Sequence, residues 1–289
     1  MHAALKPLAR QRGFTMVELI MVIVIMGVIG GAMAVFMKSP IDAYFASVRR
    51  AGMTDVADTV VRRMSRDIRK ALPNSIRTPN SQCVEFIPTK TGGRYRADDS
   101  PEGLSFSVAD TRFNMLRDNS HLLGSNSSVA AINTSMPVDQ QIAVGDVIVI
   151  YNLGIPGADA YLQDNTATVV TPAPSESGTP VETQINIAAK LFPLASSSNR
   201  FHVVAKDEKV VSYVCNVVTG NLHRTVNATD FSSSCPATGP ILARHVSACN
   251  FDYSGSDLQR NALIRMMIQL TESDETVSLQ HEVNVNNSP

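Results

Sequence analysis

A run of apolar residues near the N-terminus constrains this chain more than any other feature. From Phe14 to Met37 the side chains are almost all apolar, and Glu18 is the one carboxylate among them. About 20 apolar residues of helix cross the hydrocarbon core of a bilayer, so this run is long enough to span a membrane. A charge inside a bilayer costs roughly 2.5–3.5 kcal/mol even on the lenient insertion scale. Glu18 therefore either lies near the interface or meets a partner inside the membrane.

The residues before the run are basic. The segment Met1–Gly13 carries Lys6, Arg10 and Arg12 and no acid, which is typical of the first part of an export signal. An ordinary signal peptide is cut after its apolar stretch at a small-residue site, whereas Lys38-Ser39-Pro40 follows this one. We therefore expect the apolar run to stay in the mature protein.

The start of the run carries a specific motif. The string Gly13-Phe14-Thr15-Met16-Val17-Glu18 resembles the cleavage and methylation motif of type IV prepilins and of type II secretion pseudopilins. The resemblance implies that a prepilin peptidase cuts after Gly13 on the cytoplasmic side and methylates the new amine of Phe14. It also implies that Glu18 sets subunit register, because its carboxylate and a neighbour's amine would offset each other's cost in hydrocarbon. Pairing with its own N-terminus and recognition by the peptidase are simpler roles for Glu18.

Helical periodicity continues beyond the membrane-length run. One stripe of apolar residues recurs at spacings of three or four, which predicts an amphipathic helix: Met53, Val56, Val60, Met64, Ile68 and Leu72. Pro73 should end this helix, and Pro40 should kink or interrupt it. Gly27 and Gly31 form a G-x-x-x-G pair, which predicts close helix packing in lipid, although glycine is also simply frequent in such spans.

After Leu72 the pattern changes to strands and loops. Runs rich in β-branched and aromatic residues are bounded by Gly, Pro, Asn and Asp: "CVEFIP", "GLSFSV", "DVIVIY", "FHVVAK", "VVSYVCNVV", "HVSACNFDYS" and "LIRMMIQL". We expect a C-terminal hairpin across Thr271–Glu275 and another at Thr219-Gly220-Asn221, with exposed loops at 118–138 and 171–184. The predicted class is α+β, a pilin-like long N-terminal helix packed on an antiparallel, meander-like sheet.

Four segments follow from these patterns. Residues 1–13 are expected to be a cleaved leader and 14–37 a transmembrane helix. Residues 38–72 are expected to continue as amphipathic helix into the head, and 73–289 to form a β-rich head outside the membrane.

All four cysteines lie in the expected head, and in an exported domain an even number predicts disulfides. Three pairings are possible. Cys215 lies at the end of a strand, and a hairpin would bring the chain back beside it at Cys235, so we expect Cys215–Cys235. Cys83–Cys249 then follows only by elimination.

Composition and motif searches indicate no catalytic chemistry. A net charge of −1 gives no electrostatic case for nucleic acid as a partner. The six histidines have no metal-ligand spacing, no cysteines have C-x-x-C spacing, and no nucleophile elbow occurs. The group Asp98, Asp99 and Glu102 is more typical of a solvated turn than of a calcium site. We expect no catalytic residues, no cofactor and no metal.

The expected head contains sequence strings that resemble one subgroup of these proteins. Several of its strings resemble the MshO-type minor pilins of mannose-sensitive haemagglutinin (MSHA) pili: "NSIRTP", "CVEFIPTKTGGRYR", "GDVIVIYNLG", "RFHVV", "SYVC", "ILARHVSACNFDYSG" and "LQHEVNVNNSP". This resemblance implies a minor subunit of a surface filament that acts in biogenesis, at the tip or in priming assembly. The implied partners are the peptidase, other major and minor pilins, the inner-membrane assembly platform and, before assembly, membrane lipid.

The resemblance also implies a place in the cell. The chain would cross the inner membrane once with its head in the periplasm, and would later lie in a pilus at the cell surface. Two other functions stay open at this point. One is a J-like pseudopilin of a type II secretion system, and the less favoured one is a signal-anchored periplasmic enzyme or binding protein.

Overall fold

The computed structural model describes residues 13–96, 102–116, 133–177, 182–232, 235–253 and 261–289. Two compact units meet within one helix, the first ending at Gly52 and the second running from Met53 to Pro289. Each unit is described by itself, and the second is called the head.

Helix α1 runs from Met16 to Ile68 with Pro40 inside it. The expected interruption at Pro40 is wrong, because the helix continues through this residue although proline removes one backbone hydrogen bond. The helix also ends before the expected Leu72. The Lys70 and Ala71 amides turn back onto Asp67 and Ile68, and Leu72 then donates its amide to Ile87 at 2.7 Å, as a strand residue would.

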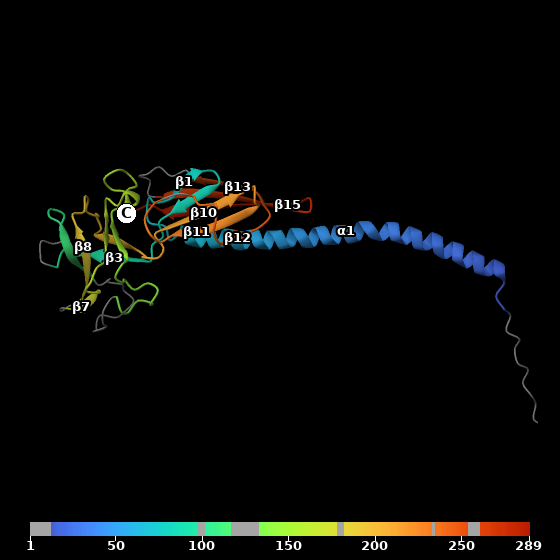
Figure 1. The fold of residues 1–289 in the computed structure, drawn as a ribbon, viewed down its shortest axis with the longest axis horizontal. Helices are drawn as coiled ribbons and strands as arrows, with labels where there is room; N and C mark the ends of the chain where they lie inside the picture. The colour runs from blue at the N-terminus through green and yellow to red at the C-terminus, as the bar shows by residue number, and fades with distance from the viewer. Residues whose placement is uncertain (1–12, 97–101, 117–132, 178–181, 233–234, 254–260) are drawn as a thin grey trace, which may run out of the picture. The chain divides into compact units, whose positions relative to one another are not determined.

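The head contains three antiparallel sheets within the described residues (Figure 1). The five-stranded sheet has the order β1-β2-β10-β11-β12, and the three-stranded sheet the order β13-β14-β15. Their strands are β1 (Arg77–Asn80), β2 (Cys83–Phe86), β10 (Val210–Asn216), β11 (Asn221–Asn227), β12 (Ile241–Ala243), β13 (Val246–Tyr253), β14 (Asn261–Glu272) and β15 (Glu275–Asn286).

The third sheet has seven strands in the order β6-β5-β9-β3-β4-β8-β7. Its strands are β3 (Thr91–Tyr95), β4 (Asp110–Leu116), β5 (Val147–Ile150), β6 (Thr166–Thr168), β7 (Ser175–Ser177), β8 (Glu182–Lys190) and β9 (Arg200–Val204), and a short 3₁₀ helix, η1 (Ala160–Leu162), precedes β6. The expected α+β class is confirmed, but the strands form three sheets rather than one meander.

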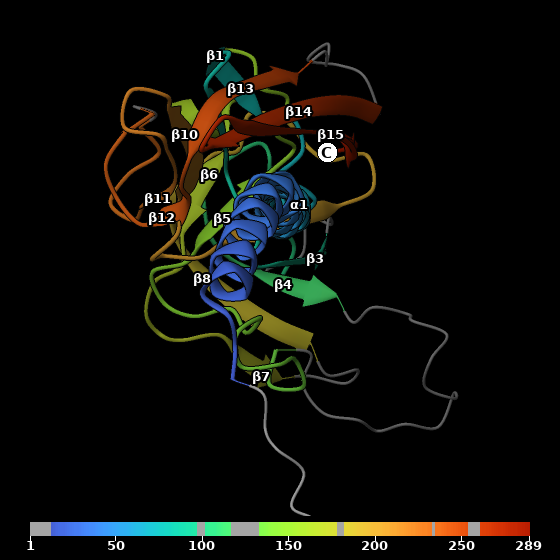
Figure 2. The same ribbon diagram turned by 90° about the vertical axis from the view of Figure 1, so that its right-hand side faces the viewer.

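The C-terminal part of α1 supplies one wall of the first core. Its buried stripe includes Met53, Val60, Met64 and Ile68, packed with buried residues of the five-stranded and three-stranded sheets. Figure 2, seen along α1, shows strands of both sheets around this part of the helix. Val56, which the periodicity placed on the stripe, is 43% exposed and lies at its edge.

The seven-stranded sheet has a core of its own, which contains Tyr95, Phe113, Phe192 and Phe201. A third cluster joins this sheet to the chain that leaves α1 and to β10, because Leu72 and Ile87 pack there with Val149 and Val210. The head therefore holds two hydrophobic cores with a bridging layer between them.

Most of the strong sequence signals became strands. The C-terminal hairpin is confirmed as β14–β15, with Thr271 opposite Thr276, and the second as β10–β11, with Asn216 opposite Asn221. The run "GLSFSV" is not a strand, and β4 begins after it at Asp110. The expected loop at 171–184 contains β7, whereas most of 118–138 lies outside the described residues.

Candidate functional site

The predicted cleavage site lies just before α1. Gly13 and Phe14 precede the helix without regular secondary structure, and Phe14 is 79% exposed. Nothing lies within 4 Å of the position that a Cβ on Gly13 would occupy. In this structure the peptide bond between Gly13 and Phe14 is thus open to an approaching enzyme.

Glu18 belongs to a helix cap. Thr15 directly precedes α1, and its hydroxyl oxygen accepts a hydrogen bond from the Glu18 amide at 3.3 Å. A threonine followed three residues later by a glutamate is the signature of a capping box, and this signal could have been found in the sequence. A carboxylate in the first turn also complements the positive end of the helix dipole. Thr15 therefore caps the helix, and the Glu18 carboxylate adds a favourable charge to its first turn.

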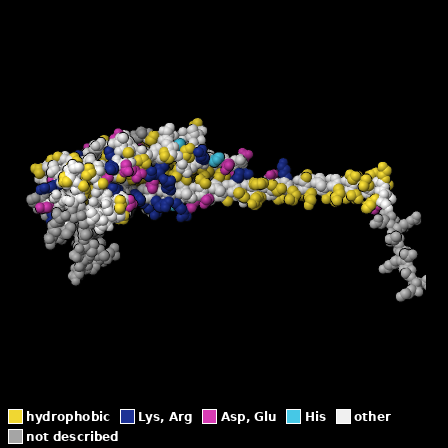
Figure 3. All heavy atoms as spheres, turned by 60° about the horizontal axis from the view of Figure 1, so that its bottom comes forward, with side chains coloured by type: hydrophobic (Ala, Val, Ile, Leu, Met, Phe, Trp, Pro, Cys, Tyr) yellow, Lys and Arg dark blue, Asp and Glu magenta, His cyan; other side chains and the backbone are white. Residues whose placement is uncertain are grey.

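The apolar run is helical and uncovered. Within the described residues, α1 is the one helix long and apolar enough to cross a membrane, and its apolar window has no buried residue. Figure 3 shows hydrophobic side chains along the N-terminal part of the helix, with Lys and Arg appearing further along. The expected packing residues Gly27 and Gly31 have nothing within 4 Å of their Cβ positions. A partner helix could therefore approach the backbone there.

A polar network in the head ties the end of α1 to the five-stranded sheet. Arg224 donates to Asp67 at 2.9 Å and to Glu208 at 2.7 Å, and the Tyr213 hydroxyl donates to Asp67 at 2.6 Å. Burial, followed by the hydrogen bond to Asp67, raises the pKa of Tyr213. Asp67, Glu208 and Arg224 line a cavity of about 640 Å³ that also carries Lys70 and other charged residues of both signs. Because its charges are of both signs and Arg224 pairs with two of its carboxylates, this cavity indicates structural cohesion and no particular ligand.

The disulfide pairing differs from the prediction. The bonds join Cys83 to Cys235 and Cys215 to Cys249, with Cα–Cα distances of 6.1 and 6.5 Å. The predicted pairs Cys215–Cys235 and Cys83–Cys249 are therefore wrong.

Side-chain alternation is the physical reason for this pairing. Cys83 lies directly opposite Val214 across β2 and β10, so the next residue, Cys215, points to the other face of the sheet. On that face Cys215 belongs, together with Cys249 of β13, to the hydrophobic core that α1 helps to form. Cys235 reaches the opposite face, where Cys83 lies. The hairpin argument brought the chain of Cys235 back toward Cys215 but ignored the face to which each side chain points.

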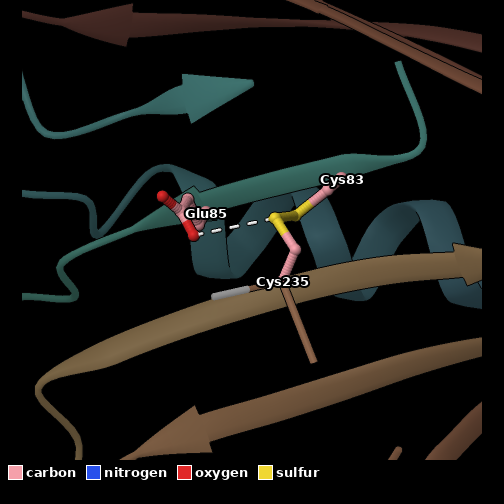
Figure 4. A group of neighbouring side chains, drawn as sticks. All are labelled: Cys83, Glu85 and Cys235. Carbon is pink, nitrogen blue, oxygen red and sulfur yellow. Dashed lines mark hydrogen bonds between the residues drawn. A yellow bond between two sulfur atoms is a disulfide. The ribbon is translucent and has the colours of Figure 1, made fainter. Parts of the chain in front are cut away.

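Cys83, Glu85 and Cys235 lie together on that second face (Figure 4). Each offers an atom within 4.8 Å of the others, and a Glu85 carboxylate oxygen lies 3.9 Å from the Cys235 sulfur. Metals bind thiolates, whereas both of these sulfurs are committed to the disulfide. The cluster is therefore no metal site in its oxidised form.

Some predicted residues are not placed by the structure. Lys6, Arg10 and Arg12 of the expected leader, and Asp98 and Asp99 of the acidic group, lie outside the described residues. Among the described residues we identify no arrangement of nucleophile, base and orienting group.

One comparison with known proteins bears on these features. Residues 8–34 match the family model of the prokaryotic N-terminal methylation motif. No curated protein and no solved structure matches the chain. The match supports a type IV prepilin-like protein, either a pilin-like or a pseudopilin subunit, and so a structural subunit rather than an enzyme. It implies processing by a prepilin peptidase and assembly with other pilins, and the apolar helix fits a membrane anchor.

Proposed function

We propose that this chain is a minor structural subunit of a type IV pilus of the MSHA kind, most similar to the MshO-type minor pilins. The observation that carries the proposal is the methylation motif at the head of an uncovered, membrane-length helix. The strings in the head that resemble MshO-type subunits support the narrower assignment. Such a subunit acts in pilus biogenesis, at the tip or in a priming complex, and so in adhesion to surfaces.

Each part of the chain has a role in this proposal. Residues 1–13 are removed by the prepilin peptidase, which methylates Phe14, and residues 14–37 hold the subunit in the inner membrane. Residues 38–72 carry the helix into the head, and residues 73–289 form its β-rich part, which lies in the periplasm and later at the cell surface. The partners are other major and minor pilins, the assembly platform and membrane lipid, with no nucleic acid.

In this proposal, two sets of residues in the apolar run act in assembly. Glu18 pairs with the Phe14 amine of a neighbouring subunit and fixes the register between them, since an unpaired carboxylate and an unpaired amine are both costly in hydrocarbon. Gly27 and Gly31 let a neighbouring helix approach closely.

Complementation of a strain that lacks the gene tests the proposal. The wild-type chain should be found by mass spectrometry to begin at methylated Phe14, and electron microscopy should find surface filaments restored. Glu18→Ala should insert and be processed, because removing a charge makes the span more apolar, but it should not restore filaments. Asp42→Ala is the matched control, since Asp42 is another exposed acid of α1 and lies beyond the apolar run.

Three results would count against parts of the proposal. An intact Met1 terminus in cells with an active peptidase would refute the prepilin assignment. Normal filaments in the deletion strain together with a loss of secreted proteins would identify a type II secretion pseudopilin. Full restoration of filaments by Glu18→Ala would remove the register role.

A further inference from the structure

A second cavity opens on the seven-stranded sheet, away from the residues that the proposed function uses. It has a volume of about 580 Å³ and is lined by residues of β3, β4 and β9 together with Met136. This volume falls in the range of small-molecule sites, roughly 300–1,000 Å³. The question is which chemistry its lining would recognise.

Two arginines stand side by side in the lining of this cavity. Arg94 of β3 lies directly opposite Arg200 of β9, and both line the cavity. The Tyr95 amide donates to the Asn199 carbonyl, so the backbone hydrogen bonds between β3 and β9 are made by Tyr95 and by every second residue before it. Arg94 and Arg200 therefore form a non-hydrogen-bonded pair, the kind in which opposite side chains approach most closely.

Like charges in such a position repel and destabilise the sheet. Neither arginine forms an ion pair within the part of the chain that the structure describes, whereas Arg77, Arg96 and Arg224 each pair with a carboxylate. Acidic residues are also absent from the described lining of the cavity. Two unpaired guanidinium groups side by side favour an oxyanion, because their planar forks match carboxylate and phosphate geometry.

His202 adds a third polar group on the same face. It is two residues from Arg200 on β9 and so points to the same side of the sheet. Its Nε2 is buried and has no hydrogen-bond partner among the described atoms. Burial, followed by the nearby charge of Arg200, lowers the pKa of His202 to about 4, so the imidazole is neutral at pH 7.

A neutral imidazole has one donor and one acceptor nitrogen, and buried donors without partners are rarer than buried acceptors. We therefore assign the hydrogen to Nδ1. This atom lies 3.7 Å from the position that a Cβ on Gly92 would occupy. Gly92 is opposite His202 and has no side chain, so at this register position no side chain of β3 covers Nδ1.

The rest of the lining is apolar or backbone. Leu116 lies directly opposite Arg94 and so contributes an apolar side chain on the same face of the sheet, and Gly92 and Gly93 lack side chains. Such a lining suits the carbon skeleton of a small ligand better than a fully hydrated ion.

From this geometry we propose that the cavity binds a small hydroxycarboxylate, the class that includes uronic acids, with its carboxylate on Arg94 and Arg200 and a hydroxyl on His202. The charge of the arginine pair selects the carboxylate. The neutral imidazole donates to a hydroxyl oxygen without requiring a second charge. All these residues belong to the head, so the inference does not depend on how the chain is processed or assembled.

Isothermal titration of the full chain in detergent, at pH 7 and low salt, tests this site. The probes are D-galacturonate, its neutral analogue D-galactose, and inorganic phosphate. Galacturonate should bind with a millimolar or lower Kd and galactose should not bind. The double variant Arg94→Gln/Arg200→Gln should bind galacturonate at least about tenfold more weakly, because charge-assisted hydrogen bonds are lost. The single variant Arg200→Gln should show a smaller loss in the same direction.

The matched control is Arg112→Gln, which removes an exposed arginine of β4 that does not line the cavity. It should bind galacturonate as the wild type does. An equal loss of galacturonate affinity in Arg112→Gln would mean that only the overall charge of the protein matters, and would overturn the site. Phosphate binding as tight as galacturonate binding would overturn the hydroxycarboxylate class, and no galacturonate binding would overturn the proposal as a whole. Unchanged circular dichroism of the variants excludes misfolding as the cause of a loss.

Discussion

Two stretches of one helix carry apolar side chains in opposite environments. In the apolar run, Val24 is 58% exposed and Phe36 is 79% exposed, whereas Met64 and Ile68 in the head are fully buried. The difference lies in the arrangement of the side chains rather than in their identity. The first stretch is apolar all round and none of the described residues covers it, while the second is apolar on one stripe that two sheets cover. One helix thus has two kinds of surroundings, and its pattern of apolar residues changes where the surroundings change.

The prediction with the largest expected effect removes a disulfide from the head. Cys83 and Cys235 are 152 residues apart, and the chain-entropy model gives about 5 kcal/mol for a loop of that size. Cys83→Ser/Cys235→Ser should therefore lower the free energy of unfolding of the head by about 2–5 kcal/mol in urea titrations. Cutting after Gly13 should not change, since the cleavage site belongs to the other unit. Loss of cutting in this variant would mean that the peptidase reads the head as well as the motif.

A pair of identical substitutions in α1 sharpens the comparison further. Met64→Ala should lower the unfolding free energy of the head by about 2–5 kcal/mol, because it removes a fully buried side chain from a packed core. Met26→Ala should leave that free energy unchanged, since Met26 is 67% exposed and touches no core. Denaturant titration of the full chain in detergent measures both. Equal losses would show that the first stretch supports the head after all.

The third expected effect depends on pH and is the smallest at any single step of one pH unit. The pKa of His202 is lowered to about 4 in the folded head, so the unfolded chain binds one more proton between about pH 6.5 and 4. Stability should therefore fall as the pH falls through this window, by at most about 1.4 kcal/mol per unit from this group. Thermal unfolding of wild type and His202→Gln at intervals from pH 7 to 4 should give a flatter dependence for the variant. Parallel curves would contradict the burial of a neutral imidazole.

The sequence predicted the features that depend on local pattern. The helical stripe from Met53 to Ile68 and the hairpin across Thr271–Glu275 follow from periodicity and turn residues, and both are present. The motif from Gly13 to Glu18 was likewise readable, although the Thr15 cap within it was missed.

Strand β3 could not be predicted in the same way. Its sequence, "TGGRY", has two glycines, which disfavour a strand by propensity. The strand forms because a side chain on Gly93 would come within 2.9 Å of the Phe201 ring, so the glycine lets this buried ring lie against the backbone. That reason exists only once β9 lies beside β3.

The candidate ligand site depends on register as well. Arg94 and Arg200 are far apart in the sequence and meet only because β3 and β9 pair with this particular alignment. The disulfides depend on register too, since one residue decides which face of β10 a cysteine occupies. Local patterns predict the elements, whereas the faces and their neighbours come from the assembled sheet.

The disulfide connectivity also has a consequence for how the head matures. The order along the chain is Cys83, Cys215, Cys235, Cys249, and the two bonds interlock, since each closes around one cysteine of the other. A head that crosses a membrane in chain order behind the apolar run presents Cys83 and Cys215 before their true partners. An oxidase that joined cysteines in order of arrival would produce the isomer with Cys83–Cys215 and Cys235–Cys249. Correct oxidation therefore requires either that the sheet assemble before the thiols are oxidised or that an isomerase exchange the first bonds.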